Sequence, residues 1–354
     1  MMDHILRMER ALELAARGAG YVAPNPLVGA VLVARGRVIG EGFHTRFGAP
    51  HAEVEAIRAV QDPGLLAEAT LYVTLEPCCH HGKTPPCTDL IIRTRIPRVV
   101  IGARDPFSRV AGRGAAALRE AGIDVVEGVL AAECARQNTR FCTFHERGRP
   151  WVLLKWAETA DGFIARPDSS SQWISGEAAR RLAHQWRSEE AAVMVGTRTA
   201  LIDNPALTVR HIEGPQPIRV VVDRELSLPH TLTLFDGRVP TVVLTRRDAP
   251  PPRPNVQWIT LDPGQADAPA LLAALHRADI LSVMVEGGAT LISSFIDAGL
   301  WDEARVFVSE TRFGAGRAAP KLSGAPDCCE QIDRDTLQVW HHHPGHSGDT
   351  ERRV

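Results

Sequence analysis

Residues 76–87, EPCCHHGKTPPC, concentrate side chains that can bind a metal or act as nucleophiles. This segment holds three cysteines, two histidines and a lysine. The upstream segment PHAEVEAI adds His51, Glu53 and Glu55 at the expected start of a helix. A catalytic zinc ion takes three protein ligands, nitrogen or thiolate sulfur, and keeps one position open for water. One histidine and two cysteines from these segments meet that requirement.

The order of these residues is typical of zinc-dependent base deaminases. Such enzymes carry His-x-Glu followed by Pro-Cys-x-x-Cys, and the glutamate moves protons without binding the metal. His51, Glu53, Pro77 and Cys78 match this pattern. The second cysteine, Cys87, departs from it, because eight residues separate it from Cys78 instead of two.

Two alternatives stay open at this point. On a regular helix, Glu55 shares a face with His51 while Glu53 does not, so helical geometry alone does not select Glu53. A closed structural zinc site is the other alternative. It needs four ligands, and His80 or His81 could supply the fourth.

The cysteine count argues against a disulfide framework. Seven cysteines form an odd set with two adjacent pairs, which suits metal or thiol chemistry better than disulfides. We interpret Cys79 as a bystander, because adjacent thiols cannot both bind one ion comfortably and a fourth ligand would close the site.

The second half of the chain offers a lysine and a glycine turn. Lys155 interrupts the apolar segment WVLLKWA and is one of three lysines in an arginine-rich chain. A charge there must be paired or functional, so Lys155 is either a site residue or part of a buried ion pair. The segment VEGGATL places a glycine turn between a strand ending at Glu286 and a helix from Ala289, where backbone N–H groups could bind phosphate. The lack of GxGxxG argues against an ordinary Rossmann site.

The surrounding pattern predicts two layered α/β domains, residues 1–147 and 148–354. In the first we expect strands at 28–34, 37–42, 70–75 and 98–103, and helices at 3–18, from 51, at 87–94 and near 113–122. In the second we expect strands at 151–156, 191–196, 218–223, 240–245 and 281–288, and helices at about 175–188, 268–278 and 289–298. Residues 246–255 indicate a proline-rich loop, and the histidine-rich end from about 341 indicates a disordered tail rather than a metal site.

Composition narrows the class of function. A chain of 354 residues that is 44% hydrophobic can bury a sizeable core. A net charge of -2 provides no general basic surface for nucleic acid. No apolar run has the length of a membrane span, and the start forms an amphipathic helix rather than a signal peptide. We therefore expect a cytoplasmic protein that acts on small molecules, without nucleic acid or membrane partners.

Four segments of the first half resemble the deaminase half of the RibD family of bifunctional riboflavin biosynthesis proteins: PNPLVGA, HAEVEA, EPCCHHGKTPPC and DPFSRVAGRG. The resemblance implies a cytidine-deaminase-like three-layer domain in which His51, Cys78 and Cys87 hold zinc and Glu53 shuttles protons. It places five residues around the substrate, with Lys83 able to meet its phosphate: Asn25, His44, His80, Lys83 and Asp105. Phe107 is a departure, because family members often have asparagine after the Asp-Pro pair.

The second half resembles the reductase half of the same family, with a dihydrofolate-reductase-like fold. The resemblance rests on LLKWAETADGFIA, SQWIS, DNPALTVR, VVVD and VEGGATL. It places Lys155 in the reductase site as a substrate contact or proton donor. The implied NADPH contacts are Ala157, Trp173, Thr199, Asp203, Gly288, Ala289, Thr290, Leu291, Ile292, Ser293 and Ser294. The implied substrate contacts are Ser171, Arg187, Leu207, Arg210 and Glu286. Arg224 stands where the family often has serine, and a cation there could favour the extra phosphate of NADPH.

The resemblance implies a bifunctional enzyme with zinc and NADPH as cofactors. It would deaminate 2,5-diamino-6-(5-phosphoribosylamino)pyrimidin-4-one and then reduce the ribosyl group of the uracil product to a ribityl chain. It also makes a homo-oligomer, a dimer or tetramer, plausible. One rival is a nucleoside or tRNA deaminase with an inert second domain, although a tRNA enzyme would need a basic surface. The other is a non-catalytic zinc-binding scaffold, which the intact His-x-Glu pattern disfavours.

Overall fold

Residues 2–80, 85–167, 174–265 and 267–342 are described by the computed structural model. The chain divides into an N-terminal unit, Met1–Gly148, and a C-terminal unit, Arg149–Val354. This division falls one residue after the boundary expected from the sequence. No helix among the described residues is long and apolar enough to cross a membrane.

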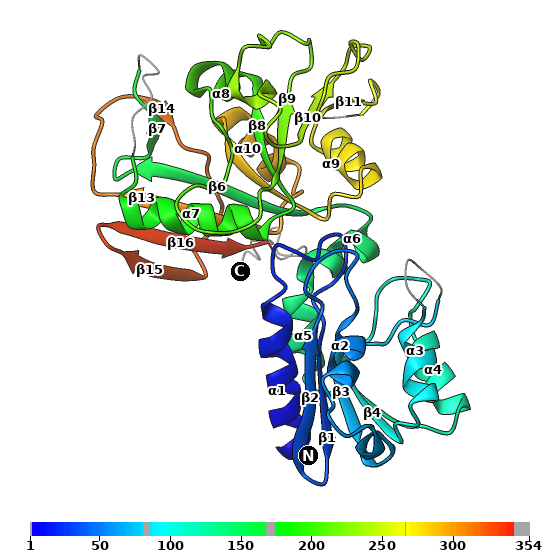
Figure 1. Cartoon of the computed structure of the whole chain (residues 1–354). Helices are drawn as coiled ribbons and strands as arrows, with labels where there is room; N and C mark the ends of the chain where they lie inside the picture. Colours follow the sequence, from blue (N-terminus) through cyan, green and yellow to red (C-terminus); the bar gives the residue numbers. More distant parts are fainter. Residues whose placement is uncertain (1, 81–84, 168–173, 266, 343–354) are drawn as a thin grey trace, which may run out of the picture. The chain divides into compact units, whose positions relative to one another are not determined.

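The N-terminal unit is built on a five-stranded mixed sheet of order β2-β1-β3-β4-β5 (Figure 1). The antiparallel pairs are β1 with β2 and β1 with β3, and the remaining pairs are parallel. Its strands are β1 (Gly29–Ala34), β2 (Arg37–Phe43), β3 (Thr70–Leu75), β4 (Arg98–Ala103) and β5 (Asp124–Glu127). Its helices are α1 (Met2–Ala16), α2 (Ala52–Arg58), η1 (Pro63–Glu68), α3 (Cys87–Arg93), α4 (Arg113–Glu120), α5 (Ala131–Gln137) and α6 (Thr139–Arg147).

Helices cover both faces of this sheet, because alternate residues of a strand point to opposite sides. Ala30 and Leu32 of β1 pack in one core cluster with residues of α2, α3 and α4. The other face carries α1 and α5. There the backbone of α1 lies so close to β1 that a Cβ on Gly29 would meet the carbonyl oxygen of Ala11 at 1.9 Å. The unit therefore has three layers.

The C-terminal unit is built on a nine-stranded sheet of order β11-β10-β9-β8-β12-β6-β13-β16-β15 (Figure 1). The pairs of β16 with β13 and β15 are antiparallel and the others are parallel. Its strands are β6 (Trp151–Thr159), β8 (Ala192–Gly196), β9 (Ile218–Val222), β10 (Thr241–Thr245), β11 (Val256–Thr260), β12 (Ser282–Gly287), β13 (Glu303–Ser309), β15 (Cys328–Ile332) and β16 (Asp335–His341). Strands β7 (Phe163–Ala165) and β14 (Arg317–Ala318) form a separate two-stranded sheet.

Helices lie on both faces of the nine-stranded sheet. They are α7 (Glu177–Glu189), α8 (Thr197–Asp203), η2 (Thr233–Phe235), α9 (Asp267–Arg277) and α10 (Ala289–Asp297). Helices α9 and α10 share one core cluster with Leu154 and Val283, whereas α7 and α8 share the other with Leu153 and Met284. The strands between these layers are mostly apolar throughout, as expected for parallel strands buried on both faces. The carboxyl ends of β6, β8 and β12 meet at one edge, where parallel α/β sheets bind ligands.

Several elements were not predicted from the sequence, and one end was misplaced. The elements not predicted are η1, β5, α5, α6, β7, α8, η2, β11, β13, β14, β15 and β16. Residue 341 was expected to begin a disordered tail, but His341 ends β16 and its backbone N–H donates to the Asp327 carboxylate at 2.6 Å. Pairing with β13 therefore extends the sheet beyond the predicted end. Residues 343–354, with the rest of the histidine cluster, lie outside the described residues.

Candidate active sites

The N-terminal unit brings a histidine and two cysteines together from three elements. His51 caps α2, Cys78 follows β3, and Cys87 is the first residue of α3. The His51 Nδ1 atom lies 3.6 Å from the Cys78 sulfur and 3.3 Å from the Cys87 sulfur. All three ligand atoms lie within 4.8 Å of one another. One nitrogen and two thiol sulfurs at this spacing fit zinc, and three ligands leave one tetrahedral position for water.

Glu53 lies beside this cluster in the first turn of α2. Its side chain is buried, with 3% of its surface exposed, and its carboxyl group interacts with the Cys87 thiol. Burial raises the pKa of Glu53, and the negative charge of Cys78 adds to this effect. A carboxyl group whose pKa lies closer to neutral pH is suited to accept and return protons.

Glu76 holds the cysteine loop against α4, a role that the sequence analysis missed. Its carboxylate accepts hydrogen bonds from the backbone N–H groups of Gly112 at 2.8 Å and Ala115 at 3.0 Å, and so caps α4 from outside the helix. The helix also packs tightly on the loop, because a Cβ on Gly114 would meet the Pro77 carbonyl oxygen at 2.1 Å. In the sequence, the signal for this role was an acidic residue directly after the apolar strand segment TLYVTL.

A short polar chain leads to His51 from the segment before β1. The Asn25 side-chain nitrogen lies 2.9 Å from His44 Nε2, and His44 Nδ1 lies 3.0 Å from the Pro50 carbonyl oxygen. The rings of His44 and His51 meet edge to face with centroids 5.4 Å apart. Burial lowers the pKa of His44, which favours a neutral ring. Two of the predicted substrate contacts therefore adjoin the metal cluster.

The other side of this site carries Asp105, His80 and Phe107. Burial raises the pKa of Asp105 to about 7, and its carboxylate accepts the backbone N–H of Phe107 at 2.8 Å. The Phe107 ring packs edge to face on His80 at 5.9 Å. The Cys79 thiol instead faces the Arg109 carbonyl oxygen at 3.7 Å. Lys83 and His81 lie outside the described residues.

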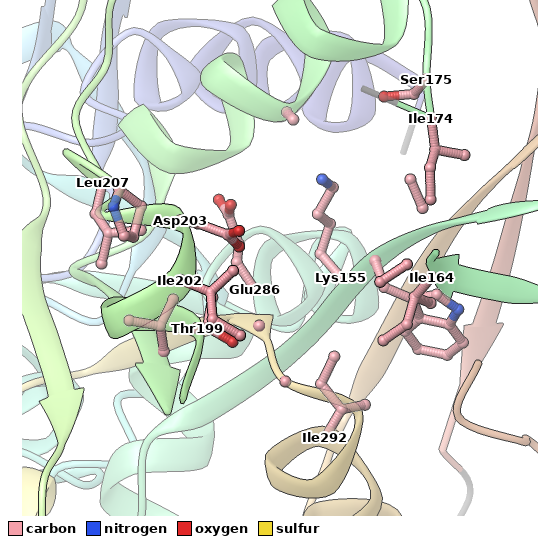
Figure 2. A pocket seen from close by; sticks show the side chains of 18 of the residues that line it. Lys155, Ile164, Ile174, Ser175, Thr199, Ile202, Asp203, Leu207, Glu286 and Ile292 are labelled. Atoms are coloured by element: carbon pink, nitrogen blue, oxygen red, sulfur yellow. The ribbon is translucent and has the colours of Figure 1, made fainter. Parts of the chain in front are cut away.

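The C-terminal unit holds a cavity of about 520 Å³ at the carboxyl ends of its central strands (Figure 2). Eleven of the residues expected in the reductase site line it: Lys155, Ala157, Arg187, Thr199, Asp203, Leu207, Arg210, Glu286, Gly288, Ala289 and Ile292. Four others, on the body of α10, do not line it: Thr290, Leu291, Ser293 and Ser294. Ser171 and Trp173 lie outside the described residues.

Lys155, Arg187 and Glu286 form a charged group in this cavity. Arg187 Nε and Nη2 each donate to the Glu286 carboxylate at 2.6 Å, and Arg187 Nη1 donates to the Thr208 carbonyl oxygen at 3.0 Å. The side chains of Lys155 and Glu286 extend into the same cavity (Figure 2). The pairing of β6 with β12 sets Leu154 beside Val285, which brings the residues that follow them into proximity.

A register shift in β12 changes the direction of the Glu286 side chain. The pairing of β12 with β8 is irregular between Val285 and Gly287, and Glu286 lies at this irregularity. Bulges of this kind redirect single side chains near active sites. Although burial opposes ionisation, the Arg187 charge and hydrogen bonds lower the pKa of Glu286 to about 2. Burial lowers the pKa of Lys155, while the negative charge of Glu286 opposes that effect.

His184 is a cavity residue that the sequence analysis missed. It lies in α7 with 4% of its surface exposed, and its Nδ1 accepts the backbone N–H of Arg210 at 3.2 Å. Burial lowers the pKa of His184 to about 4, and the charges of Arg187 and Arg210 act in the same direction. A neutral histidine therefore fixes the backbone that carries Arg210. The helix HQWR offered no motif that would have singled it out.

Comparisons with known proteins cover both units. The cytidine and deoxycytidylate deaminase zinc-binding region matches residues 1–103, and the RibD C-terminal domain matches residues 150–337. The riboflavin biosynthesis protein RibD of Actinobacillus pleuropneumoniae is 40% identical over 92% of this chain and 88% of its own length. That of Escherichia coli is 38% identical over 90% of this chain and 88% of its own length.

The chain belongs to the RibD family. A solved deaminase/reductase of this family from Thermotoga maritima is 40% identical and superposes with a TM-score of 0.87, covering 97% of this chain and 99% of the other. Acinetobacter baumannii RibD is 34% identical with the same TM-score and coverage. The expected fold class is confirmed: a cytidine-deaminase-like unit precedes a dihydrofolate-reductase-like RibD reductase unit. This RibD chain is thus a bifunctional enzyme of riboflavin biosynthesis.

Zinc and NADPH, the cofactors expected for a RibD protein, fit the two sites. The three donor atoms described above could hold a zinc ion. For NADPH, the cavity volume lies within the usual range for ligand sites. The turn at Gly287 and Gly288 brings the backbone close to Thr199, because a Cβ on Gly287 would meet the Thr199 methyl group at 2.7 Å. Arg317 adds a cation there, since its Nη2 donates to Thr290 Oγ1 at 3.0 Å and its side chain lines the cavity.

Arg224, the other departure from the family pattern, pairs with an acid. Its Nη2 lies 2.7 Å from the Asp267 carboxylate, which also pairs with Arg246 at 3.0 Å. Arg224 is not among the residues that line the described cavity. The suggestion that it favours the extra phosphate of NADPH therefore gains no support from its placement.

Proposed function

We propose that the enzyme deaminates 2,5-diamino-6-(5-phosphoribosylamino)pyrimidin-4-one in its N-terminal unit and reduces 5-amino-6-(5-phosphoribosylamino)uracil in its C-terminal unit. The second substrate is the product of the first step. Water replaces the amino group as ammonia in the deamination. One NADPH and one proton then convert the ribosyl group to an open ribityl chain. The Thermotoga maritima relative, a diaminohydroxyphosphoribosylaminopyrimidine deaminase/5-amino-6-(5-phosphoribosylamino)uracil reductase, supports this assignment.

In the deaminase site we propose His51, Cys78 and Cys87 as the zinc ligands. Zinc, when bound, supplies a water of lowered pKa. Glu53 would accept a proton from that water as it attacks the amino-bearing carbon, and would return protons to the departing ammonia. The burial of Glu53 and its interaction with Cys87 support this role. We propose four more residues as contacts of the substrate ring and ribose phosphate: Asn25, His44, His80 and Asp105. Lys83, which lies outside the described residues, remains a prediction.

In the reductase site we propose Lys155 as the proton donor. NADPH, when bound, supplies the hydride for the ribosyl carbon. The position of Lys155 on the cavity wall, beside the ionised Glu286, supports transfer of a proton from its ammonium group to the sugar oxygen that leaves the carbon. Each of the three Arg187 nitrogens already donates to a protein oxygen. Arginine has five N–H donors, so Arg187 can hold Glu286 and still contact the substrate. We therefore propose Arg187, Arg210 and Glu286 as substrate contacts, with the two arginines suited to the phosphate.

The NADPH contacts are proposed along one side of the cavity. Thr199 of α8 lies against the glycine turn before α10, and Asp203 of α8 lines the same cavity. We propose that both contact NADPH and that Leu207, which also lines the cavity, contacts the substrate. Backbone N–H groups at the start of α10 favour a pyrophosphate group. Ala157, Gly288, Ala289 and Ile292 complete the contacts that the cavity supports. The positions of Thr290, Leu291, Ser293 and Ser294 do not support direct contact, while Trp173 and Ser171 remain predictions.

Two wider properties remain predictions. We expect a homo-oligomer, a dimer or tetramer, which light scattering on the purified protein would measure. We expect a cytoplasmic location, which fractionation would check. The partners expected from the chemistry are small molecules, namely the pyrimidine ribose phosphates and NADPH.

The observation that carries the proposal is the presence of both sites in one chain. A three-ligand cluster with a buried glutamate lies in one unit, and a cavity with an ionised Arg187–Glu286 pair lies in the other. A deaminase with an inert second domain would not need the second site. A zinc scaffold would not need a buried glutamate beside its ligands.

A coupled assay tests the proposed order of reactions. The diamino substrate and NADPH are supplied together, and NADPH absorbance is followed with the wild type and with Glu53→Gln. We expect oxidation by the wild type alone, because deamination must come first. If the wild type releases ammonia but leaves NADPH unchanged, the reductase assignment is wrong. If it does neither, the proposed substrate is wrong.

A further inference from the structure

Arg219 is a fully buried cation that does not line the reductase cavity. It lies in β9 with none of its surface exposed. Its Nε donates to Thr241 Oγ1 at 3.0 Å and its Nη1 to the Thr233 carbonyl oxygen at 3.0 Å. Its Nη2 donates to the Asp236 carboxylate at 3.0 Å and to the Val239 carbonyl oxygen at 2.6 Å. A buried charge is tolerated only with partners of this kind, and three of the four lie on one loop.

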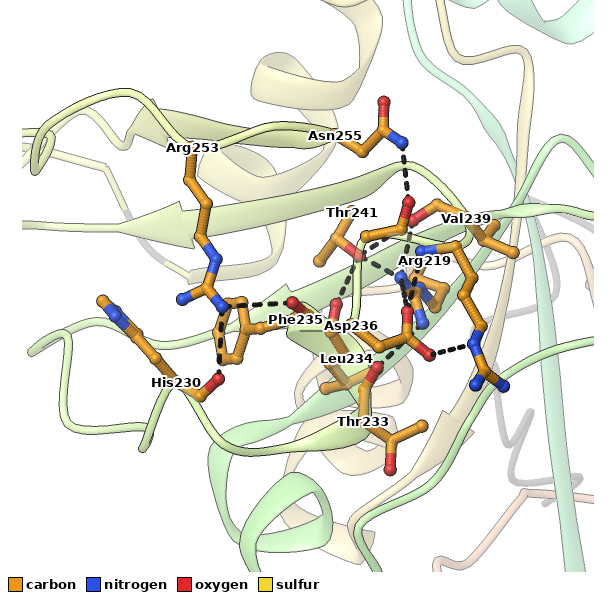
Figure 3. Close-up of polar contacts among 12 residues, drawn as sticks. Arg219, His230, Thr233, Leu234, Phe235, Asp236, Val239, Thr241, Arg253 and Asn255 are labelled. Carbon is orange, nitrogen blue, oxygen red and sulfur yellow. Dashed lines mark hydrogen bonds and ion pairs between the residues drawn. The ribbon is translucent and has the colours of Figure 1, made fainter.

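We name residues 229–239 the clamped loop, because side chains from outside it hold its carbonyl groups (Figure 3). Thr241 Oγ1 donates to the Leu234 carbonyl oxygen at 2.6 Å. Arg253 Nη2 donates to the Phe235 carbonyl oxygen at 3.3 Å, and Asn255 Nδ2 donates to that of Gly237 at 2.7 Å. Loops are usually mobile at the surface. These bonds instead make the clamped loop a fixed support.

The clamped loop reaches the reductase cavity at Thr233. Thr233 lines the cavity, and its backbone N–H donates to the side-chain oxygen of Asn204 at 2.7 Å. Asn204 also lines the cavity and ends α8, the helix that carries Thr199 and Asp203. A continuous set of hydrogen bonds therefore runs from the buried Arg219 to the turn that follows α8.

That turn holds two residues in the left-handed region of backbone conformation. Asn204 has a φ of 38° and Leu207 a φ of 51°. Asparagine tolerates this region, but a leucine there is strained. Such strain persists only where the surroundings over-determine the conformation. Leu207 is held by burial, with 2% of its surface exposed, whereas Asn204 is exposed and depends on its bond to Thr233.

We propose that Asn204 is a positioning residue for NADPH binding. Through the Thr233 N–H it fixes the α8 turn on the clamped loop, so that Asp203 and Thr199 face the cofactor in one conformation. This inference rests on the proposed reductase function. Because this hydrogen bond orders the turn before NADPH binds, binding does not carry that entropy cost. Loss of the bond would therefore weaken NADPH affinity rather than slow the chemical step.

The test removes each end of the bond separately. Asn204→Gly keeps a residue that tolerates positive φ but deletes the acceptor. Thr233→Pro deletes the donor, and the extended Leu232 before it (φ -64°, ψ 148°) is compatible with a following proline. Asn255→Gly is the matched control, because Asn255 also has positive φ (56°) and also bonds to the clamped loop, but does not line the cavity. NADPH affinity is measured by titration, and kcat at saturating NADPH with the uracil substrate.

We expect Asn204→Gly and Thr233→Pro each to weaken NADPH binding about fivefold, the effect of one net hydrogen bond. The double variant should also lose about fivefold rather than about 25-fold, because both changes remove the same bond. Asn255→Gly should match the wild type, and kcat should stay within about twofold of it in all variants. Ammonia release, which takes place in the other unit, should be unchanged.

Unchanged NADPH affinity in Asn204→Gly would overturn the inference. Equal weakening by Asn255→Gly would also overturn it, since the loop would then act through general stability. Additive losses in the double variant would show that the two residues act separately. If the wild type itself binds no NADPH, the proposed function fails, and this inference fails with it. That outcome is distinguishable because it does not depend on the variants.

Discussion

His51 precedes α2 instead of lying within it, and this changes which glutamate approaches the zinc ligands. Its backbone is extended, with φ -74° and ψ 162°, so its side chain does not follow helical periodicity. His51 and Glu55 therefore do not share a helical face. Glu55 pairs with Arg58 at 3.1 Å near the surface, whereas Glu53 is buried.

Replacing Glu53 with glutamine should remove proton transfer and keep the zinc site. We expect Glu53→Gln to lower the rate of ammonia release by about 10² to 10⁴, the usual contribution of a general acid–base group. Zinc content, measured by atomic absorption, should equal that of the wild type, because Glu53 is not a proposed ligand. Glu55→Gln serves as the matched control and should keep its activity. Loss of zinc from Glu53→Gln would assign Glu53 to the metal instead.

The pH dependence of the reductase should report Lys155. Burial lowers the pKa of Lys155 from the usual lysine value. A proton donor acts in its protonated form, so kcat should fall as pH rises through this lowered pKa. Lys155→Arg should have a lower kcat without that fall, because arginine stays protonated. The exposed Lys321 provides a control, and Lys321→Arg should keep the wild-type profile. A profile that is the same in Lys155→Arg and wild type would exclude Lys155 as the donor.

At the scale of elements, close contact between helix and sheet positions both sites. Helix α2 carries Glu53 and follows His51, and it lies directly on β2. A Cβ on Gly42 would meet the Ala56 backbone nitrogen at 2.3 Å and the Ala52 carbonyl oxygen at 2.5 Å. Backbone atoms cannot move aside as a flexible side chain can. Gly42, the second glycine of RVIGEGF, therefore helps to set the distance between α2 and the sheet.

Adding a methyl group at Gly42 should displace α2. We expect Gly42→Ala to lower the free energy of unfolding by about 1 to 3 kcal/mol, the usual cost of overpacking, and to reduce ammonia release. Urea denaturation measures the first effect. Gly264→Ala is the control, because its Cβ would only meet the Asp262 side chain at 3.5 Å. A Gly42→Ala protein with wild-type stability and activity would show that α2 tolerates the shift.

At the scale of the whole molecule, each unit has its own sheet and its own buried cores. The three proposed zinc ligands lie in the N-terminal unit, and the described cavity is lined only by residues of the C-terminal unit. The two activities should therefore respond separately to changes that affect one site.

Zinc removal should separate the two activities. After treatment with a chelator, we expect ammonia release from the diamino substrate to be abolished, because in the proposed mechanism the metal lowers the pKa of the attacking water. NADPH oxidation with the deaminated uracil substrate should continue at the wild-type rate, and added zinc should restore ammonia release. Loss of both activities on chelation would instead show that the reductase unit depends on the metal.

The sequence by itself determined the features that depend on near neighbours along the chain. The His-x-Glu and Pro-Cys segments, the glycine turn at 287 and 288 and the apolar strands are local patterns. Side-chain type and order suggested a zinc site directly, and the resemblance of these segments to the RibD family implied NADPH as the second cofactor. Lys155 was likewise noticeable, because a charge in an apolar strand needs a partner or a function.

Only the tertiary structure decided which distant residues meet. Lys155, Arg187 and Glu286 come together because β6 and β12 pair in one register and a bulge turns Glu286. Glu76 caps α4, and His184 holds the backbone of Arg210, through contacts between segments that are distant in the sequence. The support of Asn204 by the clamped loop depends on the buried Arg219, whose partners on that loop the sequence does not identify. Strand register and burial are set by packing over the whole unit, and no local pattern contains that information.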